Sequence, residues 1–557
     1  MSATTRLSVS LIVLALAAAL APADVRLPAI LSDNMVLQQD RPAVIWGWAE
    51  PGEKVAVAVG GQTGQAVADA QGRWKVTLPA LAASSQPVEM TVAGRNTLTV
   101  RNILVGQVWV CSGQSNMEMA VSNSKDAAAE IQGGDLPTIR LFTVAHTNVA
   151  QTQEDLREKV RDEARPDSPE RPGRRARWLI CSPDTIGPFS AIGYFFGREI
   201  HKTLKTPVGL INSSWGGTPI ESWTPMETYR TDPSVADFLA AIEQNNKGFA
   251  QAQEAYPALV AKWGATTQAI VATNPAATQP AKAPGQRRAL PPKPPLPVPS
   301  AVKYGGMYNG MIAPLTPYAI AGVIWYQGES NAQPRTQYHR QLPAMIRAWR
   351  KAWGHEFPFL IVQLANFMAP EADPSKAAGY ATVREAQAAA LSLPKTGLAV
   401  AIDVGDAADI HPKDKQTVGQ RLALAALAVA YGKDLVYSGP MFESMAIEGG
   451  KVRVSFKHVG GGLVVRGQKL EGFALAGPDG VYHWADAVLD GNTVVLTSPE
   501  APNPAAVRYA WANNPACNLY NKEGLPAVPF RAGEKDPLTQ PASAGAETKV
   551  PGKADSR

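Results

Sequence analysis

The sequence predicts an α/β protein, with a parallel sheet between two layers of helices and a β-sandwich-like accessory domain at each end. Three observations lead to this prediction. A globular chain of 557 residues, with 45% hydrophobic and 18% charged residues, is too long for one ordinary core. Short strand-like segments separated by turn residues occupy both ends of the chain. Between them, continuous apolar runs alternate with helical patterns, as expected of strands buried on both faces.

Residues 1–23 have the features of a secretory signal peptide. Arg6 supplies a positive charge, Leu7 to Leu20 form an apolar stretch, and "APA" at residues 21–23 is a small-residue cleavage site. The stretch is short for a membrane span, although an uncleaved N-terminal anchor is the alternative. We therefore expect an exported protein, periplasmic or extracellular, that has no membrane association after cleavage.

The segment 24–102 is predicted to form the N-terminal β-sandwich domain. Its strand-like segments are rich in valine and aromatic residues and are separated by turn signals such as "EPGE" and "DAQG". They are "AVIWGWA", "KVAVAVG", "RWKVTL" and "VEMTVAG".

The segment 103–435 is predicted to form the α/β/α domain. Its candidate strands are "ILVGQVWVC", "PVGLINSSW", "YAIAGVIWYQ", "FPFLIVQLA" and "TGLAVAIDV". Three candidate helices follow from the pattern. One begins after Ser190, a plausible cap, one covers 343–353 with Pro343 in its first turn, and one covers 416–431 before Gly432. A Pro/Ala-rich excursion at about 266–302 cannot bury a core and is expected to be flexible or extended.

The segment 436–532 is predicted to form a C-terminal β domain, and the polar residues 533–557 a disordered tail. The C-terminal strand-like segments are "KVRVSF", "GLVVRG", "GFALAG", "TVVLTS" and "VRYAWA".

Charge and composition exclude several classes of function. A formal charge of +5 is small for this length and gives no reason to expect a nucleic-acid partner. Three cysteines allow at most one disulfide, and whether Cys111 and Cys181 form it is left open. Seven histidines without paired ligand spacing indicate no metal site, and no cofactor is expected. The oligomeric state is also left open.

Polar clusters follow the candidate strands of the α/β segment. Ligands of open α/β sheets bind beyond the carboxyl ends of the strands, so such clusters at one edge would form a site. The clusters are "SGQSN", "NSSWGGT", "YQGESN", "QLAN" and "DVGDAADIHP".

A hydrolytic set can be assembled from these clusters. Ser115 lies where a strand gives way to a helix, so it is either an exposed nucleophile or a serine that caps the helix. His411 is the histidine at a strand's carboxyl end, and histidine is the usual base for serine. Asp409 lies two residues before it, on the same face of an extended chain, and could orient the imidazole.

Other groups in the clusters could bind an oxyanion or a sugar. The N–H groups of Ser115, Gly216 and Gly217 and the amide of Gln327 are candidate oxyanion donors. Trp215, Trp223 and Trp325 could stack on a sugar ring, although tryptophans in apolar runs more often belong to the core. Glu329 needs an explanation, because an unpaired charge in a buried run is costly.

Several motifs, taken in order, resemble those of the sialate O-acetylesterase family, within the wider SGNH group of serine esterases. The resemblance covers nearly all of the mature chain except the low-complexity segments and the tail. The motifs are "LPAILSDNMVLQ", "GQSNM", "FSAIGYFFGREI", "INSSWGGTPIESW", "NGMIAPL", "IWYQGESNA", "DIHPKDKQTVGQRLALAALA" and "RYAWANNPACNLYNKEGLPAVPFR".

The resemblance implies an SGNH-type three-layer fold and hydrolysis of O-acetyl esters on sugars without a cofactor. Ser115 matches the nucleophile, His411 the base and Asp409 the acid, while some related esterases assign the acid to the glutamate of "QGE", here Glu329. Gly217 and Gln327 match oxyanion positions. The usual Gly–x–Asn–Asp setting is absent, and "YQGESN" stands in its place.

The substrate is expected to be an acetylated sugar or oligosaccharide: a sialate ester, or acetylated xylan or xyloglucan. Two other readings stay open. One is an esterase for other short acyl esters with the same catalytic groups, and the other is a non-catalytic carbohydrate-binding protein on the same scaffold.

Overall fold

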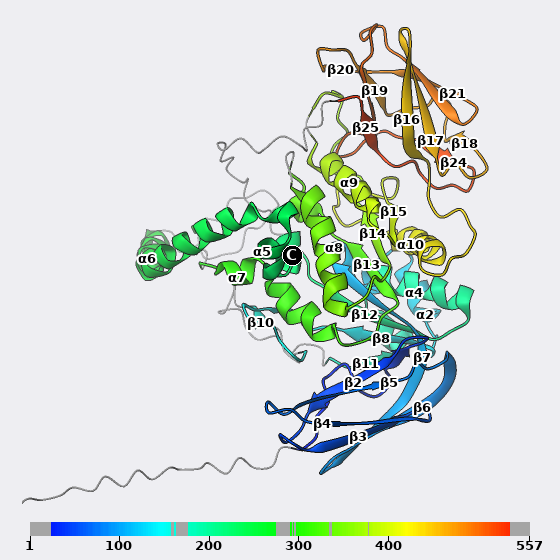
Figure 1. Ribbon diagram of the computed structural model, residues 1–557. Helices are drawn as coiled ribbons and strands as arrows, with labels where there is room; N and C mark the ends of the chain where they lie inside the picture. Colours follow the sequence, from blue (N-terminus) through cyan, green and yellow to red (C-terminus); the bar gives the residue numbers. More distant parts are fainter. Residues whose placement is uncertain are drawn as a thin grey trace, which may run out of the picture.

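The computed structural model describes residues 24–156, 161–162, 176–273, 290–291, 293–294, 297–333, 337–376 and 378–534 (Figure 1). The predicted signal peptide and residues 535–557 of the predicted tail lie outside this part of the chain. Among the described helices, none combines the length and the apolar character needed to cross a membrane.

A central sheet runs through the middle of the molecule in the order β11-β8-β12-β7-β13-β14-β15. Its strands pair in parallel, except that β11 is antiparallel to the neighbouring β8. The predicted α/β class is therefore confirmed, with one antiparallel strand at the edge. The strands are β7 (Thr97–Gly113), β8 (Ile139–Thr143), β11 (Trp178–Ile180), β12 (Val208–Ser214), β13 (Gly322–Tyr326), β14 (Phe359–Gln363) and β15 (Thr396–Val400).

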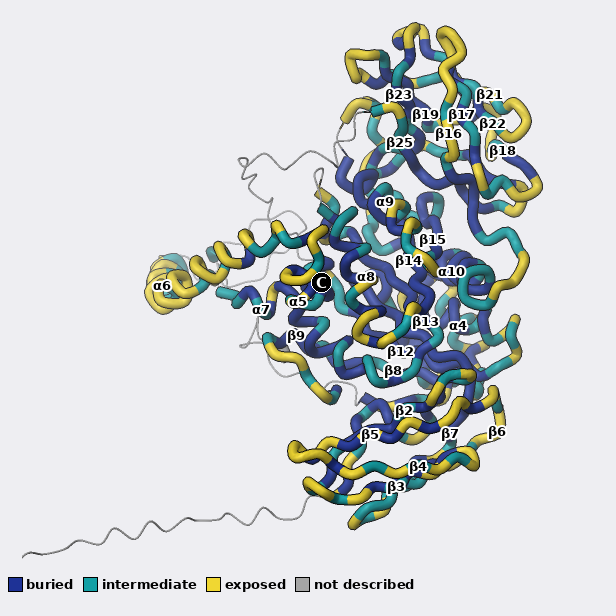
Figure 2. The backbone as a smooth tube through the Cα atoms, in the orientation of Figure 1, coloured by how far each residue is buried: buried dark blue, intermediate teal, exposed yellow. Residues whose placement is uncertain are grey.

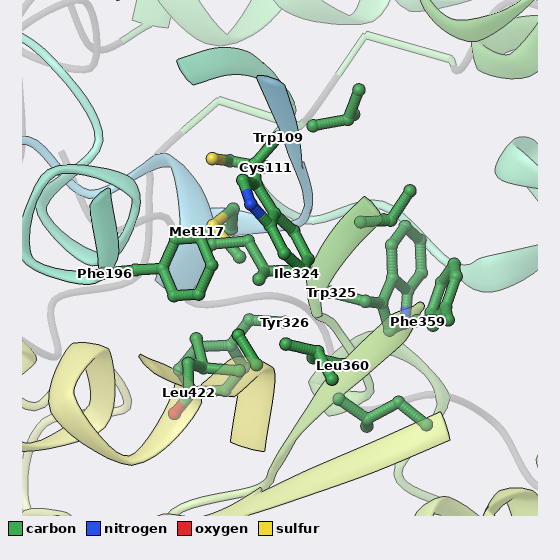
Figure 3. Close-up of a cluster of buried hydrophobic side chains, with 14 of the residues drawn as sticks. Trp109, Cys111, Met117, Phe196, Ile324, Trp325, Tyr326, Phe359, Leu360 and Leu422 are labelled. Atoms are coloured by element: carbon green, nitrogen blue, oxygen red, sulfur yellow. The ribbon is translucent and has the colours of Figure 1, made fainter. Parts of the chain in front are cut away.

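Helices cover both faces of this sheet, and the side chains of β7 and β13 show how. Trp109 of β7 packs edge-on against Phe196 of α4 (Ala191–Leu204), with 5.0 Å between the ring centroids. On the opposite face, Trp325 of β13 packs against Trp349 of α8 (Tyr338–Trp353) at 5.7 Å. Figure 3 shows these layers meeting in the core, where successive strand residues point to opposite faces.

The predicted helices form, with some changes in their bounds. The Ser190 hydroxyl accepts a hydrogen bond from the N–H of Gly193 at 3.1 Å and caps α4, as predicted. Helix α10 (Lys415–Val429) packs beside α4, and α9 (Gly379–Ala389) packs beside α8. Helix α8 begins at Tyr338, so Pro343 lies inside the helix and not in its first turn. The buried Tyr338, which bonds to Trp325 and Gln327, extends the helix toward its N-terminus.

Shorter helical elements connect these layers. They are α1 (Ser115–Glu118), η1 (Val121–Asn123), α2 (Ala127–Gln132), α3 (Pro183–Ile186), η2 (Ile220–Trp223), α5 (Met226–Thr231), η3 (Pro233–Val235), α7 (Ser300–Lys303), η5 (Tyr308–Ile312), η6 (Ala313–Leu315), η7 (Glu329–Asn331) and η8 (Ala390–Ser392).

The N-terminal strands join the central sheet through β7. This strand pairs with β6 over its first half and with β12 and β13 over its second half, so it crosses the predicted limit between residues 102 and 103 without a break. The N-terminal strands are β1 (Val36–Gln38), β2 (Ala43–Trp48), β3 (Lys54–Val59), β4 (Gln62–Val67), β5 (Arg73–Leu78) and β6 (Ser84–Ala93); β9 (Thr147–Asn148) and β10 (Arg161–Asp162) form a separate pair.

Helix α6 (Phe238–Thr273) projects from the body of the protein (Figure 1) and is largely exposed (Figure 2). Residues 266–273, predicted to belong to a flexible or extended excursion, are the last turns of this helix. The predicted start of the excursion, about residue 266, was too early: "TTQAIVAT" continues the helix, and the proline-rich sequence begins only at Pro275. Residues 274–289 lie outside the described part of the chain.

The C-terminal strands form small antiparallel sheets at the other end of the molecule, in the orders β16-β17-β22-β21, β20-β19-β23-β25 and β18-β24. The strands are β16 (Met441–Glu448), β17 (Lys451–Lys457), β18 (Leu463–Val465), β19 (Phe473–Ala476), β20 (Tyr482–Trp484), β21 (Asp486–Asp490), β22 (Thr493–Thr497), β23 (Ala506–Tyr509), β24 (Leu519–Asn521) and β25 (Phe530–Ala532).

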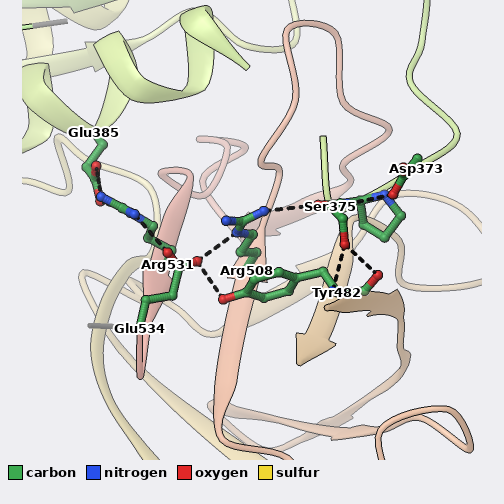
Figure 4. A network of polar contacts seen from close by, with 8 residues as sticks. Asp373, Ser375, Glu385, Tyr482, Arg508, Arg531 and Glu534 are labelled. Atoms are coloured by element: carbon green, nitrogen blue, oxygen red, sulfur yellow. Dashed lines mark hydrogen bonds and ion pairs between the residues drawn. The ribbon is translucent and has the colours of Figure 1, made fainter. Parts of the chain in front are cut away.

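Charged hydrogen bonds join these sheets to the central part of the chain. Arg531 of β25 binds both carboxylate oxygens of Glu385 in α9, at 2.7 and 2.9 Å (Figure 4). Arg384, in the same helix, is fully buried and donates to four carbonyl oxygens. The loop that follows β15 and continues to His411 contacts the same region: Asn366 accepts the N–H of Gly405 at 2.8 Å and donates to Oδ1 of Asn514 at 2.8 Å.

All three cysteines, Cys111, Cys181 and Cys517, carry free thiols. Cys111 belongs to the core below the carboxyl end of β7 (Figure 3). The disulfide that the sequence left open is absent from the structure.

Candidate active site

Three of the predicted polar clusters lie side by side at the carboxyl edge of the central sheet. Gly113 of β7 is in register with Ser214 of β12 on one side and with Tyr326 of β13 on the other. The segments that follow these strands therefore begin next to one another. The loop after β15 reaches the same place, because His411 contacts Ser115 directly.

Ser115 is exposed by a turn that only glycine can make. Gly113 has φ +138°, and a Cβ there would lie 2.1 Å from the carbonyl oxygen of Tyr326. The chain then enters α1 with Gln114 at the cap position and Ser115 as the first helical residue. The Ser115 side chain does not cap this helix, and its Oγ lies 2.8 Å from Nε2 of His411.

Asp409 lies beside His411, as the spacing of two residues predicted. Its Oδ1 accepts the backbone N–H of His411 at 2.9 Å and lies 3.7 Å from the ring nitrogen Nδ1. The backbone bond fixes the direction of the carboxylate, and the separation of 3.7 Å from Nδ1 is longer than a hydrogen bond. The His411 ring thus lies between the Ser115 hydroxyl and the Asp409 carboxylate.

The surroundings of His411 favour its neutral form. Burial lowers the pKa of His411 below its ordinary value, and the charge of Lys415 lowers the pKa further, while the Asp409 carboxylate raises it. An imidazole that is neutral near pH 7 can accept the proton of a serine hydroxyl.

Glu329, the alternative acid, contacts a different partner. Its Oε1 accepts a hydrogen bond from the Asn116 amide at 2.6 Å, and its Oε2 is buried without a hydrogen-bond partner among the described residues. Burial raises the pKa of Glu329, while Asn116 and the nearby Lys415 lower it. Glu329 thus touches the residue next to Ser115, whereas Asp409 is the carboxylate beside His411.

The structure separates the predicted oxyanion donors that lie outside Ser115. The N–H of Gly216 donates to Glu118 Oε2 at 2.6 Å, so the expectation that Gly216 stabilises the oxyanion is corrected. Gly217 is exposed with φ +72°, and its N–H has no acceptor in the described part of the chain. The amide nitrogen of Gln327 is fully buried and is used by Asn331 Oδ1 at 2.7 Å and by Thr218 O at 3.1 Å. Both amide hydrogens of Gln327 are therefore engaged inside the protein, and the expectation that Gln327 stabilises the oxyanion is corrected to a structural role.

The three tryptophans also differ. Trp223 and Trp325 are fully buried and pack against each other with 6.0 Å between the ring centroids. Neither has a face for a sugar, so the expectation of stacking on these two residues is corrected: both belong to the core. Trp215 is only half-buried and stacks in parallel on His146, at 4.3 Å between centroids.

Two residues that the sequence analysis missed, Glu118 and His146, hold the turn beside Ser115. Glu118 Oε2 accepts the N–H of Gly216 at 2.6 Å, and Oε1 lies 3.1 Å from Nε2 of His146. A Cβ on Gly216 would lie 3.2 Å from that of Ser115, so this turn packs directly on the serine. Glu118 could have been found from its place three residues after Ser115 on a helical turn. His146 follows the short strand β8, which the apolar pattern did not reveal.

No group of three or more histidine, cysteine, aspartate or glutamate side chains in the described ranges is arranged to hold a metal ion.

Comparison with known proteins identifies the chain's relatives. A family described as carbohydrate esterase, sialic acid-specific acetylesterase matches residues 105–255 and 299–428. The mouse sialate O-acetylesterase is 29% identical, across 91% of this chain and 94% of its own length. The human sialate O-acetylesterase is 30% identical, across 91% of this chain and 92% of its own length.

A solved structure agrees with the sequence relatives. The crystal structure of a carbohydrate acetylesterase from Xanthomonas citri superimposes with a TM-score of 0.72 and 35% sequence identity, covering 91% of this chain and 99% of that chain. The protein is thus a carboxylic ester hydrolase whose class of substrate is the acetylated carbohydrate. The chain belongs to the carbohydrate esterase family of sialic acid-specific acetylesterases, as its motifs indicated.

Proposed function

We propose that the protein removes O-acetyl groups from sugars by a two-step mechanism in which Ser115 is the nucleophile, His411 the general base and Asp409 the acid that orients it. The contact of 2.8 Å between Ser115 Oγ and His411 Nε2 carries this proposal. The contact joins residues from two segments that are far apart in sequence, and it lies at the sheet edge where α/β proteins bind ligands.

In the first step, Ser115 Oγ attacks the acetyl carbonyl carbon while its proton passes to Nε2 of His411. The N–H groups of Ser115 and Gly217 stabilise the negative oxygen, and the bond to the sugar oxygen then breaks, with the proton of Nε2 going to the departing hydroxyl. In the second step, water attacks the acetyl carbonyl carbon and gives a proton to Nε2 of His411. As the bond from that carbon to Ser115 Oγ breaks, Nε2 returns this proton to Oγ, and the acetyl group leaves as acetic acid, which ionises to acetate at neutral pH.

The turn that carries Gly217 supports this assignment. Glu118 binds the Gly216 N–H, which fixes the turn and leaves the next N–H free toward solvent. The stacked pair of Trp215 and His146 stands next to this turn and offers an aromatic surface for the sugar. We propose that this pair, and not the buried tryptophans, contacts the substrate.

The proposed substrates include acetylated sialosides and acetylated xylan or xyloglucan oligosaccharides. A panel of these compounds, read as acetate released, tests the proposal; release from one of these groups well above the others would name the substrate.

A series of p-nitrophenyl esters tests the rival esterase activity. We expect the rate to fall steeply beyond the acetyl ester, because a deacetylase recognises the sugar and needs room only for a methyl group. A flat dependence on acyl length would favour the general esterase, and no acetate from any acetylated glycan would favour a binding protein.

The choice between Asp409 and Glu329 is tested by Asp409→Asn. We expect kcat/KM to fall about 100-fold or more, because the imidazole loses its orienting charge. The Asp409 carboxylate raises the pKa of His411, so its removal lowers that pKa. Since the base acts when neutral, the acid limb of the pH profile of kcat/KM moves to lower pH.

Asp406→Asn is the matched control, because Asp406 is an exposed carboxylate of the same loop. We expect this variant to keep the wild-type rate and profile. An Asp409→Asn enzyme with the rate of the Asp406→Asn control would assign the acid elsewhere.

We also propose that the protein is exported, on the evidence of residues 1–23. Expression of the full chain and N-terminal sequencing of the secreted form tests this. A mature N-terminus near Asp24 is the expected result, and full-length protein retained inside the cell would contradict it.

A further inference from the structure

A buried charged network lies directly behind Ser115. Lys415, the first residue of α10, is fully buried, and its Nζ donates to Oδ1 of Asn116 at 2.5 Å. The amide nitrogen of Asn116 donates to Glu329 Oε1 at 2.6 Å and to the carbonyl oxygen of Ile410 at 3.0 Å. The reaction proposed above uses none of these side chains.

The network connects the two halves of the proposed catalytic pair. Asn116 is the neighbour of Ser115 in the chain, and Ile410 is the neighbour of His411. The one amide of Asn116 therefore ties the serine helix to the histidine loop. Its three hydrogen bonds use both amide hydrogens and one lone pair of the oxygen, at a 1% exposed position.

Only one orientation of this amide is compatible with its neighbours. An ammonium group on one side requires the amide oxygen, and a carboxylate on the other requires the amide nitrogen. Lys415 and Glu329 thus set the direction of Asn116 by charge. A neutral amide between apolar residues could rotate and would lose the bond to Ile410.

The cost of the network argues that it does more than fill space. Two charges taken out of water lose several kcal/mol of hydration each, and apolar residues of similar size often stabilise a core as well or better. Burial lowers the pKa of Lys415 to about 7, whereas the Glu329, Asp409 and Asp414 carboxylates raise it. Lys415 also lies 5.5 Å from the ring of Tyr326.

We propose that Lys415 and Glu329, joined through the amide of Asn116, are positioning residues that hold Ser115 and His411 at hydrogen-bond distance. The inference rests on the proposed roles of Ser115 and His411. Neither Lys415 nor Glu329 touches the reacting atoms; each acts through Asn116 on the backbone beside a catalytic residue.

The test compares Lys415→Met with Lys413→Met. Lys413 is an exposed lysine of the loop just before α10 and serves as the matched control. Two rates are measured: turnover of p-nitrophenyl acetate, and covalent labelling of Ser115 by a fluorophosphonate probe. We expect kcat and the labelling rate of Lys415→Met to fall about 100-fold, because a small displacement of reacting groups has an effect of this size. KM should stay within about twofold, because the groups that contact the ester are untouched.

The pH profile gives a readout that loss of packing would not produce. The charge of Lys415 lowers the pKa of His411, while Asp409 raises it. Removal of the lysine charge therefore raises the pKa of His411, and the acid limb of kcat/KM moves to higher pH in Lys415→Met but not in Lys413→Met.

Two further variants keep the inference open to refutation if Lys415→Met folds poorly. Glu329→Gln keeps the Oε1 acceptor for Asn116 and removes only the counter-charge, so we expect a smaller fall in kcat with an unchanged fold. The double variant Lys415→Met/Glu329→Gln leaves no isolated buried charge and should be more stable than Lys415→Met alone, yet just as slow.

A folded Lys415→Met or double variant with the kcat and labelling rate of the Lys413→Met control would overturn the inference. A wild-type enzyme in which the probe does not label Ser115 would instead contradict the proposed nucleophile. The two failures are therefore distinguishable.

Discussion

Ser115→Ala is expected to lower kcat for acetate release by on the order of 10⁴- to 10⁶-fold, the loss typical of removing a nucleophile that acts together with its base. The hydroxyl lies at the end of a glycine turn, half-buried, and among the described residues its hydrogen-bond partner is His411 Nε2. Its removal leaves no buried group without a partner, so the melting temperature should hardly change. Acetate release from an acetylated xylo-oligosaccharide or sialoside, whichever the wild-type enzyme hydrolyses, measures the rate.

Ser122→Ala provides the control, because Ser122 is an exposed serine shortly after the same helix. It should keep the wild-type rate. Substantial turnover by a purified Ser115→Ala enzyme, with the label of a fluorophosphonate probe on another serine, would refute the assignment.

The largest expected loss of stability comes from Arg384→Met. The guanidinium of Arg384 is fully enclosed and donates to the carbonyl oxygens of Leu364, Ala365, Ala512 and Asn513, at 2.7 to 2.9 Å. Methionine fills much of the volume but removes the Arg384 donor from all four carbonyls, of which, within the described ranges, Asn513 alone keeps a further bond, from the N–H of Phe367 at 3.2 Å. Each unsatisfied buried group costs about 1–3 kcal/mol, so we expect a loss of roughly 3–5 kcal/mol in the free energy of unfolding.

Urea unfolding followed by tryptophan fluorescence measures this loss. Arg101→Met removes an exposed arginine that is paired with Glu89 and should change the midpoint little. An Arg384→Met midpoint equal to that of the control would show that the four carbonyls find other partners. Because two of the acceptors lie in the C-terminal region, the variant should also loosen the interface shown in Figure 4.

The two predictions concern different parts of the same sheet edge. Ser115, the proposed nucleophile, lies at the end of β7 on the carboxyl edge of the sheet, whereas Arg384 binds carbonyl oxygens of the segment that follows β14. We expect Ser115→Ala to lose activity and keep its stability, and Arg384→Met to lose stability. That outcome would show that the residues needed for the reaction differ from those that stabilise the fold.

Several features of this arrangement were predictable from local patterns. Continuous apolar runs identified five strands of the central sheet, because strands buried on both faces contain few polar residues. The polar residues that follow these runs include Ser115, Asp409 and His411. Their meeting at one edge follows from the geometry of parallel strands, even though Ser115 and His411 are 296 residues apart.

Other features could not be read from local patterns. The short strand β8 carries too few residues for a periodic signal, so His146 was missed together with its stack on Trp215. Glu329 was recognised as a costly buried charge, but its link to Lys415 depends on Asn116, from a segment more than 200 residues away from Glu329.

The sequence by itself determined which segments form strands and helices and which strand ends carry groups able to do chemistry. Only the tertiary structure decided which of those groups are free to act. The Gln327 amide and the Gly217 N–H are both donors in the sequence, yet the first is saturated by Asn331 and Thr218 and the second faces solvent. The physical reason is that the hydrogen bonding and burial of a group depend on neighbours from distant segments, whereas the tendency to form a strand or a helix depends on residues adjacent in the chain.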